Sequence, residues 1–169
     1  MRRWHLYTLI GLVFGVLDWY YLDWLAFDLG QSLNVSPILG IILLVSLNYG
    51  IWLVPIIPVV IIEARKAEKI TGPILAGILT WCAAILSYYI YYGVLLALGK
   101  LPNLEYLNIF GSKYDGFWPE FWRKFRFIIL NQTLEWLPIA IIGGAVMGVL
   151  AWWIFRPRKK AGQKLESVE

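Results

Sequence analysis

Carboxylates recur near the end of the first apolar stretch of this chain. Asp18, Asp23 and Asp28 are spaced five residues apart among Trp, Tyr and Leu residues. A carboxylate inside a membrane segment is costly, and such groups often bind cations or relay protons. On a helix, however, residues five apart differ by about 140° in direction, so the three carboxylates cannot form one stripe. Asp18 lies deepest and is a candidate ion site, unless the neighbouring aromatic belt places it at headgroup level.

Helix-breaking and polar residues also lie together in the second apolar stretch. Asn48 is followed by Pro55 and Pro58, and each proline removes an amide donor and crowds the carbonyl four residues before it. Broken helices form ion and substrate sites in transporters, although a structural kink is the simpler interpretation. Asn48, Pro55 and Pro58, together with Asp18, make up the candidate polar or ion site.

Basic residues are interleaved with aromatic ones over 118–130. The apolar positions of this segment recur at intervals of three and four, which predicts an amphipathic helix. Its apolar face would consist of Trp118, Phe121, Trp122, Phe125, Ile128 and Ile129. We expect this helix to lie in the outer membrane interface, with Arg123, Lys124 and Arg126 at lipid headgroups. The alternative is a lid that packs on the rest of the protein.

Other chemistries lack the residues that they need. His5 is the only histidine and Cys82 the only cysteine, so we expect no catalytic triad and no metal site built from these side chains. The chain has no Walker A loop, no GxGxxG fingerprint and no CxxC pair, so we expect no cofactor. No catalytic residue is predicted, and nothing indicates a nucleic-acid partner.

Four long apolar stretches must position these residues. The chain is 60% hydrophobic with a mean hydropathy of +0.66, which exceeds the usual apolar share of soluble domains. The stretches cover 6–27, 38–62, 73–98 and 137–155, each long enough to cross a bilayer. Glu135 and Pro138 suit the first turn of a helix, which places the start of the fourth span beside them. We therefore predict an all-α integral membrane protein, with a four-helix transmembrane bundle over 1–156, an outer loop over 99–132 and a basic tail over 157–169.

Basic residues indicate the orientation of the bundle, because they stay preferentially in the cytoplasm. With both termini inside, ten Lys and Arg residues face the cytoplasm and five face outward. This predicts a multi-pass protein of the plasma or inner membrane with both termini cytoplasmic. Glu63 would be a solvated residue at the cytoplasmic end of the second span.

Small residues in two spans indicate where helices approach closely. Ala140, Gly144 and Gly148 are spaced four residues apart in the fourth span, and Ala76 and Thr80 have the same spacing in the third. We expect both faces to pack against neighbouring helices, within the chain or in another subunit.

These features leave three hypotheses for the function. The first, which we favour, is a non-enzymatic accessory or assembly subunit of a membrane complex, with the bilayer and other membrane proteins or copies of itself as partners. The second is a small oligomeric carrier or ion pathway that uses the broken second span. The third is a protein that binds or modifies lipid at the outer face, with Asp18 or Asp23 as an acid or base.

Overall fold

The computed structural model describes residues 2–24, 36–99 and 116–156, and every element in these ranges is a helix. The helices are α1 (Arg2–Trp24), α3 (Pro37–Gly50), α4 (Leu53–Lys66), α5 (Thr71–Ala97), α6 (Phe117–Lys124), the π-helix η3 (Phe125–Leu130) and α7 (Asn131–Phe155). The all-α prediction is confirmed for this part of the chain.

Three helical runs are long and apolar enough to cross a membrane: Arg3–Leu22, Thr71–Ala97 and Phe117–Phe155. A shorter apolar helical stretch covers Ile38–Leu47. These lengths are compatible with a multi-pass membrane protein, since a crossing needs about 20 apolar residues.

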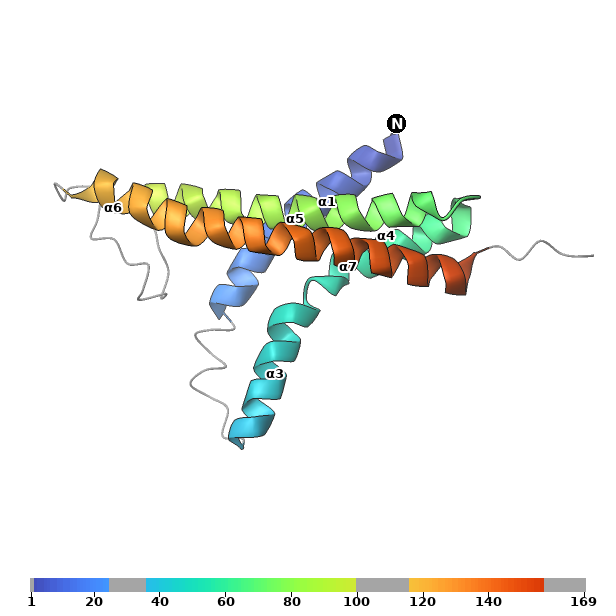
Figure 1. Cartoon of the computed structure of the whole chain (residues 1–169), viewed down its shortest axis with the longest axis horizontal. Coiled ribbons are helices and arrows are strands. Elements are labelled where there is room, and N and C mark those ends of the chain that lie inside the picture. Colours follow the sequence, from blue (N-terminus) through green and yellow to red (C-terminus); the bar gives the residue numbers. More distant parts are fainter. Residues whose placement is uncertain (1, 25–35, 100–115, 157–169) are drawn as a thin grey trace, which may run out of the picture.

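Helix α5 lies at the centre of the molecule. It packs against α1 on one side and runs alongside α7 on another, while α4 contacts both α5 and α7. Figure 1 shows α1 crossing α5 obliquely, with α5 and α7 side by side and antiparallel over most of their length. The main buried cluster includes Ile56 and Val60 of α4 and Ala84 and Ile85 of α5.

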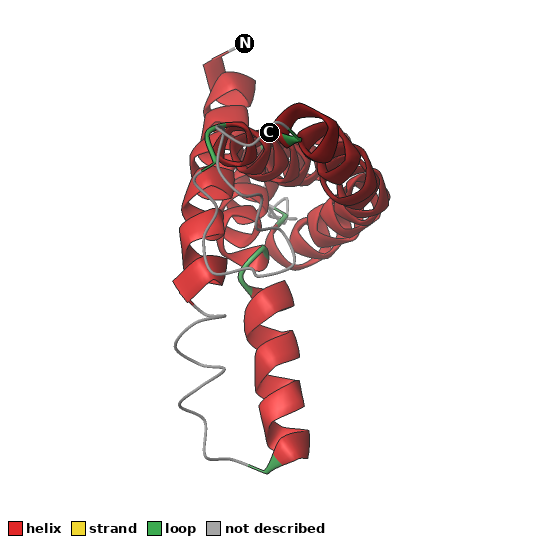
Figure 2. Ribbon diagram, turned by 90° about the vertical axis from the view of Figure 1, so that its left-hand side faces the viewer, coloured by secondary structure: helices red, strands yellow, loops and turns green. Residues whose placement is uncertain are grey.

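The second apolar stretch forms two helices instead of one. Helix α3 ends at Gly50 and α4 begins at Leu53, before the prolines that indicated a break. Pro55 lies in the first turn of α4, where a missing amide costs little. The carbonyl of Ile51 accepts a hydrogen bond from the Val54 amide at 3.0 Å, so Pro55 does not leave it without a donor. Helix α3 projects away from the other helices (Figures 1 and 2).

The segment over 118–130 is helical, but it is not a separate element. Helices α6, η3 and α7 form one run of 39 residues, so the expected helix start beside Glu135 is wrong. Within the predicted apolar face, the Trp118 and Trp122 side chains are each 60% exposed, and the lipid contact expected for them stays a prediction. The buried apolar side chains over 117–130 are Phe117, Phe121 and Ile129, which join the main cluster.

Gly93 of α5 allows the N-terminal part of the long helical run to pack closely on α5. A Cβ atom at Gly93 would lie 3.2 Å from the Phe125 ring and 3.8 Å from the Ile129 side chain. The π-helical turn widens the backbone here, and the Thr133 hydroxyl donates to the Ile129 carbonyl at 2.6 Å. Helix α5 ends nearby at Ala97. Two residues later Gly99 has a φ of 63°, which favours glycine, and the Gly99 amide donates to the Leu96 carbonyl.

Candidate functional site

One face of α1 carries two glycines followed by an acid. Gly11, Gly15 and Asp18 are separated by four and three residues, so they point in similar directions on the helix. A Cβ atom at Gly11 would collide with the Thr80 carbonyl oxygen, and one at Gly15 with the Ala84 carbonyl oxygen. The two backbones are therefore in direct contact, and this contact brings Asp18 into the interior.

Asp18 is buried, with 1% of its surface exposed. Neither of its carboxyl oxygens has a hydrogen-bond partner among the described residues. An ionised carboxylate in such a place loses its hydration without compensation, which is strongly unfavourable. Asp18 is therefore an interior residue and does not lie exposed at headgroup level.

Hydroxyls and aromatic rings connect α1 to α5 on either side of Asp18. The Ser87 hydroxyl donates to the Leu12 carbonyl at 2.6 Å. Beyond Asp18, the Trp19 ring lies 5.7 Å from the Tyr91 ring, edge to face, and the hydroxyls of Tyr20 and Tyr91 are hydrogen-bonded. These contacts fix the part of α1 that holds the carboxylate.

Glu63 is a second buried carboxylate, and its surroundings differ. Its oxygen Oε2 accepts a hydrogen bond of 2.7 Å from the Tyr7 hydroxyl, and Oε1 lies 3.7 Å from the Arg3 guanidinium. Only 5% of Glu63 is exposed, so the expectation of a solvated end residue is wrong. The reason is that α1 and the start of α5 both cover it, and a Cβ atom at Gly72 would lie 3.2 Å from its Oε1.

The residues of the predicted polar site are not seen to converge. Pro55 is buried and lines a groove with Leu9, Ile10, Val13, Phe14 and Leu17 of α1, and this lining is apolar. Pro58 is exposed. The side chain of Asn48 lies outside the described part of the structure, as does that of Asp23, and Asp28 falls in a range that is not described. Asp18 is thus the member whose placement suggests a site.

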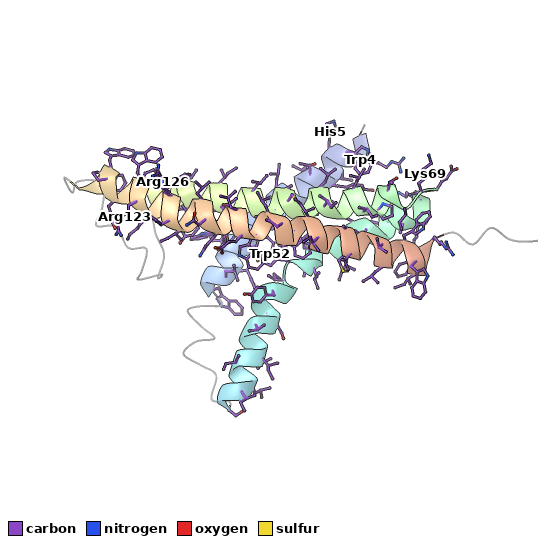
Figure 3. All side chains as sticks on the ribbon, in the orientation of Figure 1. Trp4, His5, Trp52, Lys69, Arg123 and Arg126 are labelled. Carbon is purple, nitrogen blue, oxygen red and sulfur yellow. The ribbon has the colours of Figure 1, made fainter. Side chains whose placement is uncertain are left out.

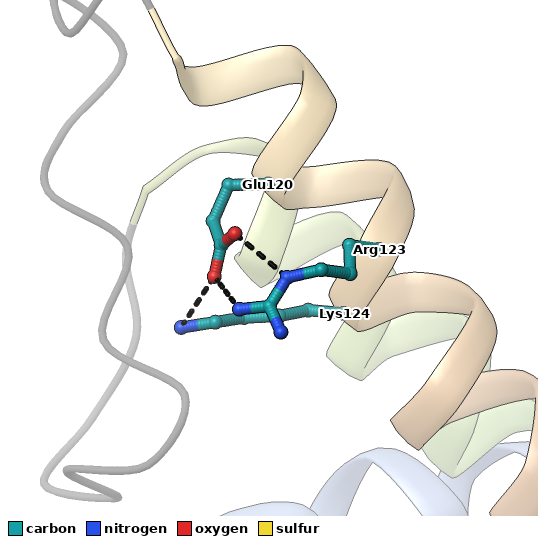
Figure 4. Close-up of polar contacts among 3 residues, drawn as sticks. All are labelled: Glu120, Arg123 and Lys124. Atoms are coloured by element: carbon teal, nitrogen blue, oxygen red, sulfur yellow. Dashed lines mark hydrogen bonds and ion pairs between the residues drawn. The ribbon is translucent and has the colours of Figure 1, made fainter.

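The three basic residues of the predicted headgroup site differ in their partners. Figure 4 shows Arg123 and Lys124 beside the Glu120 carboxylate. Arg123 donates two hydrogen bonds to the Glu120 carboxylate, at 2.9 and 2.5 Å. The Lys124 ammonium lies 3.7 Å from the same carboxylate and its side chain is largely covered. Arg126 is exposed and has no ion pair with a described residue. Figure 3 shows Arg123 and Arg126 at one end of the long helices and Lys69 at the other.

The small residues lie on two separate interfaces of α5. Cβ atoms at Gly144 and Gly148 would collide with the α5 backbone at Gly77 to Ile78 and at Pro73 to Ile74, so α7 contacts α5 there. Ala140 of α7 is also fully buried. Ala76 instead packs with Tyr7 and Val59, and the Thr80 carbonyl faces Gly11, so these two residues lie toward α1.

The first apolar stretch contains a packing signal in addition to those of the third and fourth stretches. Gly11 and Gly15 form a GxxxG pattern, which allows close helix packing in membranes. It would have identified the α1 face that approaches α5 and, three residues further on, placed Asp18 in the interface. No comparable local pattern predicts the Tyr7–Glu63 contact, because the two residues are 56 positions apart in the sequence.

Asp18 cannot meet a lipid headgroup in this arrangement, because its carboxyl group is enclosed between helices. This removes support from Asp18 as the acid or base of a lipid-modifying enzyme. Among the described residues there is also no group of three or more His, Cys, Asp or Glu side chains that could hold a metal ion.

Comparisons with family models, curated proteins and solved structures find no match to this chain.

Proposed function

We propose that this protein is an accessory or assembly subunit of a membrane complex, and that α3 is its contact with a partner membrane protein. The supporting observation is the exposure of α3. Its large apolar side chains are exposed around the whole helix: Ile38, Leu39, Ile41, Ile42, Val45, Leu47 and Tyr49. A helix that is apolar on all sides is normally buried in a larger protein or in lipid.

The direction of α3 favours protein over lipid as its cover. Its 14 residues extend about 21 Å, less than the roughly 30 Å of hydrocarbon that a spanning helix must cross. It also runs across the direction of α5 and α7 (Figure 1), so it cannot cross the membrane in parallel with them. A partner helix that packs on α3 would cover its surface and stabilise its position.

Paired substitutions test this proposal against a matched control. Ile41→Gln with Val45→Gln changes one face of α3, and Ile142→Gln with Val146→Gln makes the same changes, at the same spacing, on exposed positions of α7. The protein would be extracted gently from its own membranes and studied by native mass spectrometry. We expect a stoichiometric partner with the wild type and the α7 variant, and its loss from the α3 variant.

Two results would refute the subunit proposal. One is a protein that remains free of other chains over a range of mild detergents. The other is a partner that the α3 and α7 variants retain equally well, which would place the contact elsewhere. A homo-oligomer that depends on α3 would keep the interface but identify the partner as a second copy.

A second candidate function, a pathway for protons or small cations, is favoured by Asp18. A buried acid without a protein partner is a natural binding position for a proton or cation inside a membrane. The full-length protein in vesicles, with a membrane potential applied, should then show ion flux that Asp18→Asn abolishes. Glu120→Gln, at the far end of the long helix, is the control. Flux that Asp18→Asn does not change, or no flux, removes this candidate.

We further propose that the end of the molecule near Arg3, Arg65 and Arg156 faces the cytoplasm, and that α4 returns the chain to this end as the fourth helix of the bundle, packed on α1, α5 and α7. Arg3 reaches Glu63 at the end of α4, and the Arg65 guanidinium lies 5.4 Å from the centre of the Phe155 ring. Arg3, Arg65 and Arg156 thus lie at the same end, and the positive-inside rule favours the cytoplasm for it. In a Cys82→Ser background, an impermeant thiol reagent added outside should label Trp118→Cys and not Lys69→Cys. The reverse pattern would overturn this topology.

A further inference from the structure

The exposed side of the segment formed by the end of α6 and η3 combines a cation with large apolar side chains. Trp122 is 60% and Phe127 66% exposed, and Arg126 lies between them in sequence. A groove of about 530 Å³ follows this side of the helix. It is lined by Trp122, Arg123, Phe125, Arg126, Phe127 and Leu130. A groove lined by both arginine and large apolar side chains suits an amphipathic anion better than a fully apolar or a fully polar ligand.

The charges around the groove point to Arg126 as the group that would bind this anion. Glu120 already accepts two hydrogen bonds from Arg123 and lies within ion-pair distance of Lys124. The Glu120 carboxylate therefore pairs with two cations, whereas Arg126 has no carboxylate partner among the described residues. A guanidinium with its donors available binds phosphate through directed hydrogen bonds.

The position of Arg126 along the helix fits the depth of lipid phosphates. Arg126 and Arg156 lie at the two ends of the continuous stretch formed by η3 and α7. At 1.5 Å per residue they are about 45 Å apart, close to the 40–45 Å of a bilayer with its headgroups. If α7 crosses the membrane, each arginine lies at the phosphates of one leaflet.

We infer that the groove beside η3 is a binding site for an anionic phospholipid, with its phosphate on Arg126 and an acyl chain along Phe127 and Leu130. This site is independent of the partner contact proposed for α3. It also gives the η3 region a role beyond packing on α5, because Arg126, Phe127 and Leu130 are exposed whereas Phe125 and Ile129 pack on Gly93.

The test is a lipid titration of the full-length protein, followed by native mass spectrometry. Phosphatidylglycerol should bind more tightly than phosphatidylcholine. Arg126→Gln should weaken phosphatidylglycerol binding about fivefold, the factor that matches about 1 kcal/mol per basic residue near an anionic surface. Arg123→Gln is the matched control and should weaken it less than about twofold, because Glu120 already engages that guanidinium.

Two further variants keep the inference testable even if the Arg126→Gln variant does not fold. Arg126→Lys keeps the charge and should retain most of the binding, whereas Glu120→Gln releases Arg123 and should strengthen it. Equal affinity for the two lipids, or equal losses in Arg126→Gln and Arg123→Gln, would overturn the inference. Inorganic phosphate that displaces the lipid at millimolar concentration would show that the site binds a soluble anion, and this too would overturn it.

Discussion

Asp18 and Glu63 are both acids buried among the same helices, yet only one of them is paired. Glu63 accepts a hydrogen bond from Tyr7 and attracts Arg3, whereas the Asp18 oxygens have no partner among the described residues. Tyr7 and Asp18 lie on the same helix, about 16 Å apart along its axis. A buried carboxyl group therefore lies near each end of α1, but only the carboxyl group of Glu63 has partners among the described residues.

The difference separates a structural role from a functional one. A buried acid that joins two helices through its partners contributes to folding, and removing it leaves those partners unsatisfied. A buried acid without partners opposes folding, so its presence calls for another explanation, such as a bound proton or cation. Substitutions at the two positions should then change stability with opposite signs.

The largest effect is expected for Glu63→Leu. Removing the carboxylate leaves the buried Tyr7 hydroxyl without its acceptor, and such a loss costs about 1–3 kcal/mol. The measurement is the free energy of unfolding in mixed micelles. Glu63→Gln keeps an oxygen that can accept from Tyr7 and is the control, which should retain most of the stability. Equal losses in both variants would show that the charge, and not the hydrogen bond, stabilises this end.

Asp18→Leu should have the opposite effect. The two side chains are similar in length, and the substitution removes two oxygens that lack partners, so we expect stabilisation by about 1 kcal/mol in the same assay. Asp18→Asn keeps two polar atoms in the interior and should gain less. A clear destabilisation by Asp18→Leu would mean that the carboxyl group has a stabilising partner, and the contrast with Glu63 would fail.

The sequence was sufficient to predict the features of the fold that depend on local pattern. Apolar length predicted helices that can cross a membrane, and these are present. The break in the second stretch was indicated by Pro55, yet it occurs at Ile51 and Trp52, because a proline is tolerated in a first turn and the chain bends before it.

The remaining features depend on distant contacts. Glu63 lies beside two basic residues in sequence, which is typical of a solvated helix end, but α1 covers it in the fold. Similarly, Glu135 and Pro138 resemble a helix start, although the helix extends back to Phe117. Packing of Phe125 and Ile129 on Gly93 stabilises this extension, and no local pattern reveals it.

Tyr7→Phe sharpens the comparison by removing only the hydrogen bond. The ring stays buried and its hydroxyl is lost, so we expect destabilisation by about 1 kcal/mol. In a Glu63→Leu background the same substitution should cost almost nothing, because the acceptor is already absent. This double-mutant cycle measures the coupling between the two side chains. Equal costs in both backgrounds would show that the hydroxyl does not stabilise the protein through Glu63.

Arg3→Gln should give the smallest effect. The Arg3 side chain is 62% exposed and its guanidinium lies 3.7 Å from Glu63, a geometry for which ion pairs contribute about 0–1 kcal/mol. Because salt screens exposed charges, this small contribution should disappear near 1 M NaCl, while the effect of Tyr7→Phe should persist. A large loss in Arg3→Gln that resists salt would mean that Glu63 is stabilised mainly as half of an ion pair. The two ends of α1 would then differ in the presence of a counter-charge, and not in hydrogen bonding.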